Sequence, residues 1–307
     1  MQSVDAIVLS AGRASRFGVP KFLLPAGQGH IVLTRVVEQA LQVVDGRVAV
    51  VLGWEARVAR YALERWLEAQ PGNPGSRVHV VLNRHYPHGQ STSLKAGLRA
   101  FGNSLGVWVF LADMPALEPH RLKQLWQAIQ QRSTQTVAVA AAEQGRLRPP
   151  VFLSRQLFAE ALKLTGDQGA RAILKAYPKQ IERVEWGSGP WFHDVDDWKT
   201  YQELAQKLGW ADERFDPIPP EKTSIPPIKE LLDTALAKDP VPWLSPGLLL
   251  LASKSETRWL LLPQSYRGVQ GVIWGPAQTP AAYLQLLRRA CLAVLAANRP
   301  IGFSQIP

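Results

Sequence analysis

The feature that most constrains the fold of this chain is an abrupt change of character near its first residues. Residues 4–9 form a short apolar run, whereas residues 10–21 are small, glycine-containing and cationic. This change predicts a buried strand that delivers a loop at the edge of a sheet. Gly12 and Gly18 leave room for the backbone to approach a ligand closely. The loop also carries three permanent cations, which together with bare amides suit a polyphosphate: Arg13, Arg16 and Lys21.

Apolar runs and helical spacings alternate through the first two thirds of the chain. The runs predict strands at residues 4–9, 47–53, 78–82, 107–111 and 136–140. The spacings predict helices at residues 32–44, 56–67, 94–101 and 121–129. This alternation indicates an α/β fold, a Rossmann-like and mostly parallel sheet with helices on both faces. Ligands of such sheets bind beyond the carboxyl ends of the strands, so we expect three loops to converge there: 10–21, 83–93 and 112–116.

The first loop is neither a Walker A loop nor a dinucleotide fingerprint, because it lacks both G-K-[ST] and G-x-G-x-x-G. It resembles the signature A-G-x-x-x-R-x-G-x-x-K of nucleotidyltransferases with a GT-A-like fold, in which the loop wraps the triphosphate of an NTP. The resemblance implies that Arg16 and Lys21 steady the triphosphate and the departing pyrophosphate. It also implies nucleotide contacts from Ser10, Ala11, Gly12, Arg13 and Lys21. The alternative is a surface turn that is basic by coincidence.

Asp113 directly follows the predicted strand 107–111 and is held by the turn at Pro115. A carboxylate placed there is suited to Mg²⁺, which favours one or two carboxylates together with substrate phosphates and water. The alternative is that Asp113 caps the next helix or forms an Asx-turn. In the family, an Asp at this point binds Mg²⁺, and the local sequence D-M-P is typical of its molybdenum-cofactor branch.

Residues 89–93 read as a loop that runs into a helix, with Ser91 or Ser93 as its cap. The amides at such a helix start suit an anion or the edge of a base. The family has G-x-S-x-S-L-x-x-G here, which contacts base and ribose and so implicates Ser91, Ser93 and Gly97. His85 and His88 have the spacing of a metal pair, but no third ligand lies nearby in sequence, and we interpret them as solvated loop residues.

Residues 162–174 predict a turn with an N-cap, followed by a short amphipathic helix. Arg171 falls in its first turn, where a cation opposes the helix dipole, so it needs a partner: a phosphate or, alternatively, Asp167. The string G-D-x-G-A-R resembles a hallmark of molybdenum cofactor cytidylyltransferases. That resemblance implies that Asp167, Gly169 and Arg171 belong to the region that receives the pterin.

Three carboxylates precede a predicted helix near residue 198, where they would also favour the helix dipole. The family has D-I-D-T-P-E-D-L here and uses it for the second metal contact, which implies Asp196 as ligand and Asp194 as the alternative. One departure lies upstream. Relatives read G-H-P or G-N-P where this chain has Arg148 followed by two prolines, which bears on the acceptor pocket and not on the triphosphate site.

The 307 residues suffice for two domains. We predict a nucleotidyltransferase domain at 1–210, a proline-rich linker at 211–228 and a small α+β domain at 229–307. Within the last third, residues 248–252 and 258–262 predict a hairpin, residues 269–274 a strand and residues 281–297 a helix. No motif for chemistry is recognised there, and we interpret this domain as a docking or dimerisation module that could meet a recipient molybdoenzyme.

Net charge and cysteine content narrow the range of functions that this chain can have. The net charge is +10, and residues 1–210 hold 25 Lys and Arg against 17 acidic residues, which suits an anionic substrate. Nucleic acid is not expected, because no aromatic RNA-binding signature or dense basic run is present. A single cysteine excludes an intramolecular disulfide framework. No run spans a bilayer and no signal peptide is recognised, which predicts a cytoplasmic protein without a membrane partner.

Together the motifs resemble those of the molybdenum cofactor cytidylyltransferases, members of the MobA/MocA-like nucleotidyltransferases. The resemblance implies transfer of CMP from CTP to the terminal phosphate of Mo-molybdopterin, with Mg²⁺ as cofactor and pyrophosphate as by-product. Ala11, where the GTP-using branch has glycine, favours CTP. The alternatives are a GTP-using molybdopterin guanylyltransferase, a sugar-phosphate nucleotidyltransferase, and a non-catalytic carrier of nucleotide or cofactor.

Overall fold

A computed structural model describes residues 3–12, 21–24, 26–27, 30–54, 56–68, 70–210, 216–218, 246–252 and 257–263. The chain divides into two units. The first comprises residues 1–13, 32–56 and 63–196, and the second comprises residues 14–31, 57–62 and 197–307. Arg13, Arg16 and Gly18, like the predicted strand 269–274 and helix 281–297, lie outside the described residues.

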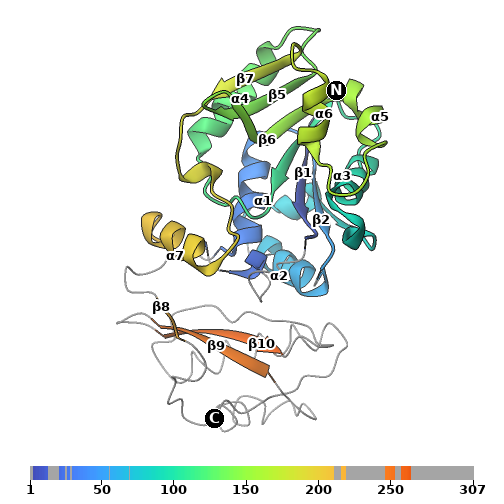
Figure 1. The fold of residues 1–307 in the computed structure, drawn as a ribbon. Coiled ribbons are helices and arrows are strands. Elements are labelled where there is room, and N and C mark those ends of the chain that lie inside the picture. Colours follow the sequence, from blue (N-terminus) through green and yellow to red (C-terminus); the bar gives the residue numbers. More distant parts are fainter. Residues whose placement is uncertain are drawn as a thin grey trace. The chain divides into compact units, whose positions relative to one another are not determined.

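Seven strands in the described part of the first unit form one sheet in the order β3-β2-β1-β4-β6-β5-β7 (Figure 1). Their bounds are β1 Val4–Ser10, β2 Val48–Leu52, β3 Val78–Leu82, β4 Gly106–Leu111, β5 Ala138–Glu143, β6 Arg146–Ser154 and β7 Ile181–Glu185. All neighbouring pairs are parallel except the two made by β6, which confirms the predicted mostly parallel sheet.

Strand β6 was not predicted. It follows β5 through the two-residue turn Gln144–Gly145, in which both residues have positive φ, of 50° and 77°. Such a turn matches the right-handed twist of a hairpin. Two prolines in the first half of β6 argue against a strand by sequence pattern alone. Pairing with β4 and β5 outweighs that signal.

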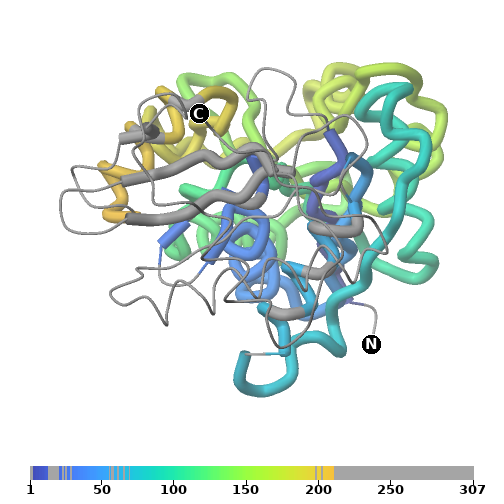
Figure 2. Tube along the Cα trace, turned by 90° about the horizontal axis from the view of Figure 1, so that it is seen from below, coloured from blue at the N-terminus to red at the C-terminus, as the bar shows by residue number. Residues whose placement is uncertain are grey.

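The described helices of this part of the chain are α1 Val32–Val43, α2 Ala56–Glu68, α3 Gln90–Arg99, α4 Pro119–Gln131, α5 Phe158–Ala161 and α6 Ala170–Ala176. Alternate residues of a strand face opposite sides of a sheet. In β4, Val107 and Val109 belong to the apolar cluster that includes Leu94 of α3, whereas Trp108 packs against Trp126 of α4. Helices α3 and α4 therefore cover opposite faces. Helices α5 and α6 lie on the α3 side, as the yellow-green and teal segments of Figure 2 show, and α1 lies beside α4.

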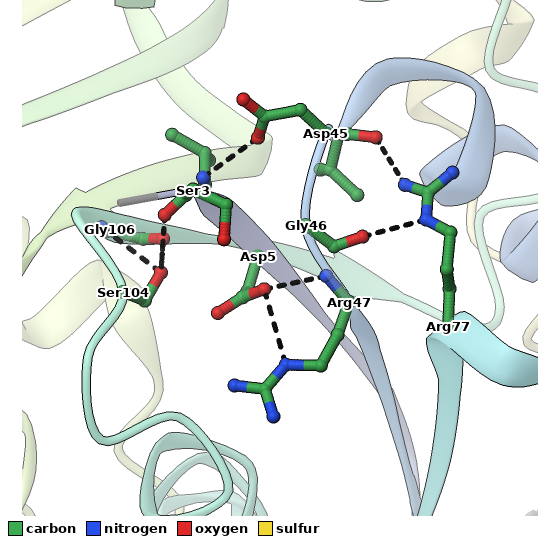
Figure 3. A network of polar contacts seen from close by, with 10 residues as sticks. Ser3, Asp5, Asp45, Gly46, Arg47, Arg77, Ser104 and Gly106 are labelled. Atoms are coloured by element: carbon green, nitrogen blue, oxygen red, sulfur yellow. Dashed lines mark hydrogen bonds and ion pairs between the residues drawn. The ribbon is translucent and has the colours of Figure 1, made fainter. Parts of the chain in front are cut away.

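The amino ends of the parallel strands are closed by a network of polar contacts (Figure 3). Asp5 is only 1% exposed; its Oδ1 accepts a hydrogen bond from the backbone N–H of Arg47 at 2.6 Å and lies 3.9 Å from the Arg47 Nε. The N–H of Val4 donates to Asp45 Oδ1 at 2.9 Å. A Cβ on Gly46 would lie 2.2 Å from Asp5 Oδ1, so glycine is required for this close approach.

Two further residues complete this network. Arg77 donates from Nε to the Gly46 carbonyl at 2.9 Å and from Nη2 to the Val44 carbonyl at 2.5 Å, which satisfies groups just past the end of α1. The Ser104 hydroxyl oxygen lies 3.1 Å from the carbonyl of Ser3. The start of β1 is therefore tied to the strands on both of its sides.

In the second unit, α7 Trp198–Lys207 begins at Asp197, whose Oδ1 accepts a hydrogen bond from the Thr200 N–H at 2.8 Å. This bond lowers the pKa of Asp197. Gly27 has a φ of 77° and packs against Trp210, whose ring a Cβ at Gly27 would meet at 2.7 Å. None of the helices among the described residues combines the length and apolar character needed to cross a membrane.

The described residues of the second unit also contain an antiparallel sheet in the order β10-β9-β8. Strands β9 Pro246–Ala252 and β10 Thr257–Pro263 confirm the predicted hairpin. Strand β8 Asp216–Ile218 lies inside the segment predicted as a linker, and its three residues pair with β9. The domain boundaries at 210 and 228 stay a prediction.

Candidate active site

A cavity of about 410 Å³ lies at the carboxyl ends of β1 and β4 and beside the start of α3. Parallel pairing sets Leu9 of β1 opposite Leu111 of β4, so the two strands end level with one another. The cavity is lined by Leu9, Ala11, Gly12, Tyr86, Pro87, Gly89, Gln90, Ser93, Leu111, Asp113 and Asp167. All three loops expected at this edge contribute to it, which confirms their predicted convergence.

The end of β1 forms one wall of the cavity. The Ala11 carbonyl accepts a hydrogen bond from the Trp54 N–H at 3.2 Å. A Cβ on Gly53 would lie 2.7 Å from that carbonyl oxygen and 2.8 Å from Tyr86 Cβ, so only glycine lets these segments meet. Gly12 is exposed, and a Cβ there would meet nothing within 4 Å. Its backbone therefore faces open space, as a phosphate-binding loop requires.

Of the other predicted residues of the first loop, those that the structure describes are not among the residues that line the cavity. Ser10 is buried at the end of β1 and is not among the residues that line the cavity, and its hydroxyl has no hydrogen-bond partner among the described residues. Lys21 begins the 3-10 helix Lys21–Leu23, which belongs to the second unit. Arg13 and Arg16 lie outside the described residues. The roles of these four residues stay predictions.

The start of α3 differs from the prediction. The helix begins at Gln90 with Gly89 as N-cap and no side-chain cap, so the predicted capping by Ser91 or Ser93 is wrong. The backbone N–H of Ser91 donates instead to the Gly166 carbonyl at 3.1 Å. Gly89 has a φ of 104°, and a Cβ there would lie 2.2 Å from the carbonyl carbon of Gly166. The turn around Gly166 therefore packs against the start of α3 and places Asp167 at the cavity.

Ser93 and Gly97 have separate places in α3. Ser93 lines the cavity, and its hydroxyl oxygen accepts a hydrogen bond from Asn83 Nδ2 at 3.0 Å. Gly97 is buried against β1, where a Cβ would lie 2.5 Å from Ile7 Cγ2. This close packing of helix on strand accounts for a glycine at position 97 and places it away from the cavity lining.

The predicted acceptor residues do not all reach the cavity. Asp167 is part of its lining, whereas Gly169 and Arg171 are not. A Cβ on Gly169 would lie 2.3 Å from Gln90 Oε1, so this glycine makes room for a lining side chain. Arg171 is exposed in the first turn of α6, and no ion pair joins it to Asp167 among the described residues. The alternative of a salt bridge between them is therefore wrong.

The predicted metal ligands come from two segments that meet. The Val195 N–H donates to the carbonyl of Asp113 at 2.8 Å, which brings residues 194–196 alongside the loop after β4. Val195 is buried and Asp194 exposed, while Asp113 and Asp196 are half-buried. No group of three or more Asp, Glu, His or Cys that could hold a metal ion exists in the described part of the chain. Two carboxylates fit Mg²⁺ if substrate oxygens complete its coordination, as this ion prefers.

The MobA-like NTP transferase domain is the family whose model matches this chain, over residues 6–183. The match covers more than half of the sequence and includes β1, α3 and the loop after β4. The chain belongs to the MobA-like NTP transferase family. It is therefore a nucleotidyltransferase.

Relatives of known name agree with this family. The molybdenum cofactor cytidylyltransferase of Escherichia coli (strain K12) is 26% identical over 190 residues, which are 60% of this chain and 89% of that protein. A probable molybdenum cofactor guanylyltransferase of Rhodopirellula baltica is 29% identical over 150 residues, 47% of this chain and 64% of that protein. The crystal structure of Rv0371c from Mycobacterium tuberculosis H37Rv has a TM-score of 0.54 and 26% identity over 66% of this chain and 97% of that one.

Arg148, which stands where the family resemblance predicts G-H-P or G-N-P, has a role in the structure. Its Nη2 donates to the Phe192 carbonyl at 3.1 Å, and its Nε lies 3.3 Å from Glu143 Oε2. The guanidinium also lies over the Phe192 ring, 5.3 Å from its centroid. Arg148 therefore holds the turn that leads into residues 194–196.

A second arginine also contacts this turn. The Arg121 guanidinium lies 3.3 Å from the centroid of the Trp191 ring, and its Nη1 donates to the Trp186 carbonyl at 2.8 Å. Trp186 in turn stacks on Phe192 with ring centroids 5.6 Å apart. Because cation–π contacts strengthen when they are shielded from water, this cluster anchors the segment that leads to Asp194 and Asp196.

Sequence reasoning missed several residues of this MobA-like site. Tyr86, Pro87 and Gln90 line the cavity, although only the serines of that loop were singled out. Their position, directly after a buried strand and at a helix start, was the available signal. The local sequence does not predict the contacts of Arg121 with Trp186 or of Arg148 with Phe192, because these partners lie more than 40 residues away.

Proposed function

We propose that this nucleotidyltransferase transfers CMP from CTP to the terminal phosphate of Mo-molybdopterin and releases pyrophosphate. The observation that carries the proposal is that Asp113, whose carbonyl accepts a hydrogen bond from Val195, lines the same cavity as Gly12. The half-buried carboxylate of Asp113 lines this cavity, and the segment of Asp196 lies alongside its loop; such a pair of carboxylates suits a nucleoside triphosphate with a divalent cation.

The reaction needs little covalent chemistry from the protein. An oxygen of the acceptor phosphate attacks the α-phosphorus of CTP, the bond from that phosphorus to the bridging oxygen breaks, and pyrophosphate leaves. The acceptor phosphate is already ionised near neutral pH, because its second pKa is about 6, so no side-chain base is required. Catalysis then depends on alignment and charge neutralisation.

Each wall of the cavity has a part in this alignment. Gly12 lets the triphosphate approach the backbone, with Lys21, Arg13 and Arg16 as predicted cationic partners. Asp113 and Asp196 hold Mg²⁺, with Asp194 as the alternative to Asp196; when bound, the ion neutralises charge that develops on the phosphates. A structure of Rv0371c in complex with manganese, 25% identical to this chain with a TM-score of 0.51, supports a divalent metal at such a site.

The choice of CTP rests on Ala11 and the acceptor on the turn around Asp167. Ala11 is buried and lines the cavity, where its methyl group narrows the space for a base. The E. coli cytidylyltransferase supports CTP, and the probable guanylyltransferase keeps GTP as the second candidate. The Asp167 carboxylate accepts hydrogen bonds, and a pterin edge offers N–H donors. Gly169 and Arg171 belong to the same predicted acceptor region.

Pyrophosphate release with Mg²⁺, Mo-molybdopterin and each of CTP, GTP, ATP and UTP tests this function. Release with CTP alone supports the proposal. Release with GTP alone would indicate guanylyl transfer instead of cytidylyl transfer. Release only when a sugar phosphate replaces Mo-molybdopterin would overturn the proposed pterin acceptor. The predicted domain at 229–307 would then be tested separately for binding to a recipient molybdoenzyme. The cytoplasmic location stays a prediction.

A further inference from the structure

A buried glutamine on α1 contacts the loop that carries Asp113. Gln39 is only 3% exposed, which is unusual for this residue type unless it is hydrogen-bonded. Its Nε2 donates to the Pro115 carbonyl at 2.9 Å and to the Leu117 carbonyl at 2.9 Å. Both protons of the amide are therefore used on one short stretch of backbone, 76 and 78 residues further along the chain.

That stretch is irregular and needs external support. Residues 112–118 connect β4 to α4 without helix or strand of their own. On its amino-terminal side, the N–H of Ala112 donates to the Leu9 carbonyl at 3.0 Å, and the N–H of Met114 donates to the Leu111 carbonyl at 3.1 Å. On its carboxyl-terminal side, Pro115 has no N–H to offer. Gln39 holds this second half of the loop.

Asp113 is thereby fixed on three sides. The bond from Ala112 to Leu9 holds the backbone before it, and the bond from Met114 to Leu111 closes a turn around it. Val195 donates to the carbonyl of Asp113 itself, and Gln39 holds the backbone after it. Metal ligands must keep their positions closely, and the partners that orient them carry much of the affinity.

The stability of the fold alone does not account for this glutamine. Its Oε1 is buried and has no hydrogen-bond partner among the described residues. An unsatisfied buried oxygen is costly, which offsets part of the stability that the two donated hydrogen bonds supply. Within the described part of the chain, Gln39 leaves its own oxygen unsatisfied, while both of its N–H groups donate to the loop that carries Asp113. This arrangement fits a residue that positions the loop better than one that stabilises the fold.

We infer that Gln39 is a positioning residue, which acts through the carbonyls of Pro115 and Leu117 to hold Asp113 in the orientation that binds the metal ion. The inference rests on the proposed function only in taking Asp113 as a metal ligand. It does not depend on the choice of base or of acceptor.

The test measures metal binding directly. Gln39→Met keeps the volume and removes both donors. Binding of Mn²⁺ to wild type and variant is followed by the relaxation rate of water protons, in the presence of non-hydrolysable analogues of CTP and of GTP in turn. Because loss of an orienting partner weakens metal sites by about 10–100-fold, we expect the dissociation constant of Mn²⁺ to rise about tenfold.

Arg77→Met is the matched control. Arg77 also donates to backbone carbonyls at α1, but at the end of the helix that lies at the amino edge of the sheet. We expect this variant to unfold at a lower temperature and to bind Mn²⁺ as wild type does. Equal weakening in both variants overturns the inference, because general destabilisation would then explain the loss.

The remaining outcomes of the experiment also test the inference about Gln39. Wild-type affinity in Gln39→Met overturns the inference whatever its melting temperature. If Gln39→Met does not fold, Gln39→Asn replaces it, since that amide is one methylene too short to reach both carbonyls, and the same tenfold loss is expected. Absence of Mn²⁺ binding in wild type overturns the inference together with the metal part of the function. Mn²⁺ binding without pyrophosphate release overturns the function alone.

Discussion

The two edges of the sheet in the first unit are built on opposite principles. At the amino edge, Asp5, Asp45 and Arg77 are each hydrogen-bonded to backbone groups of neighbouring segments, and the strand starts are closed (Figure 3). At the carboxyl edge, β1 and β4 end at a cavity in which the Gly12 backbone faces open space. Glycine serves both edges differently: Gly46 admits a carboxylate of the protein itself, and Gly12 leaves room for a ligand. The comparison teaches that stability and binding are concentrated at different ends of the same strands.

The largest expected effect tests the open edge. Asp113→Asn should lower the rate of pyrophosphate release by about 10³-fold, because loss of one charged group that stabilises the transition state costs about 10²–10³ or more. The melting temperature should change little, since Asp113 is only half-buried. Steady-state kinetics and thermal unfolding measure the two quantities. Activity near that of wild type would remove Asp113 from the proposed metal site.

A second change tests how the open edge is built. Gly89→Ala introduces a side chain at a φ of 104°, where it also meets the Gly166 carbonyl carbon at 2.2 Å. We expect the turn around Asp167 to be displaced and the free energy of unfolding to fall by about 1–3 kcal/mol. Kinetics with varied acceptor should show a raised KM for the acceptor and a smaller change for the nucleotide. The matched variant Gly102→Ala, where a Cβ meets nothing within 4 Å, should leave both unchanged.

The closed edge should respond in the reverse way. Asp5→Ala removes a buried carboxylate that accepts from the Arg47 N–H, and unsatisfied buried groups cost about 1–3 kcal/mol. We expect that loss of unfolding free energy by denaturant titration, with the turnover number of the folded enzyme unchanged. A reduced turnover number at full folding would show that the two edges are coupled, against the separation described above.

The smallest expected effect concerns Glu185, in the part of the carboxyl edge that lies outside the cavity. Glu185, at the carboxyl end of β7, accepts hydrogen bonds from the N–H groups of Gln144 and Gly145 at 2.7 and 3.1 Å, and these bonds lower its pKa. A lowered carboxyl pKa contributes stability above its unfolded value, about 4.3, and this stability is lost as the pH falls through the folded value. The melting temperature of Glu185→Gln should therefore lie slightly below that of wild type at pH 7.

The two melting temperatures should converge as the pH falls below the folded pKa of Glu185, because the wild-type carboxylate is then protonated. A difference that stays constant from pH 7 to below that pKa would rule out the carboxylate as its source.

The parts of the fold that the sequence predicts are those that depend on local residue patterns. The apolar runs 4–9 and 107–111 are strands because burial on both faces of a parallel sheet demands them. Strand β6 was not predicted, because its two prolines contradict the pattern of a strand. Only its pairing with β4 and β5 outweighs that signal. The hairpin of β9 and β10 follows from its two apolar runs, whereas the pairing of β8 has no local signal.

The candidate site shows the same division. Gly12, Ser93, Asp113 and Asp167 lie on one cavity because each follows a strand or opens a helix at a recognisable place. Gly97 belongs to a motif, but its surroundings show packing against Ile7. No motif predicts the bond of Gln39 to Pro115 or that of Arg148 to Phe192, since these partners lie 44 or more residues away. Contacts of that kind depend on the folded chain and cannot be inferred from neighbours in sequence.

The hydrogen bond from Val195 to Asp113 has a consequence for the order of events during synthesis. The phosphate-loop wall is complete in the sequence by residue 12, but the second acidic segment is the last part of the first unit to leave the ribosome. Contacts over such separations form late, because chain entropy must be lost before they are made. A nascent chain that ends after β6 would hold the Gly12 wall without its acidic counterpart. The proposed metal site would therefore be completed only after residues 194–196 have been synthesised.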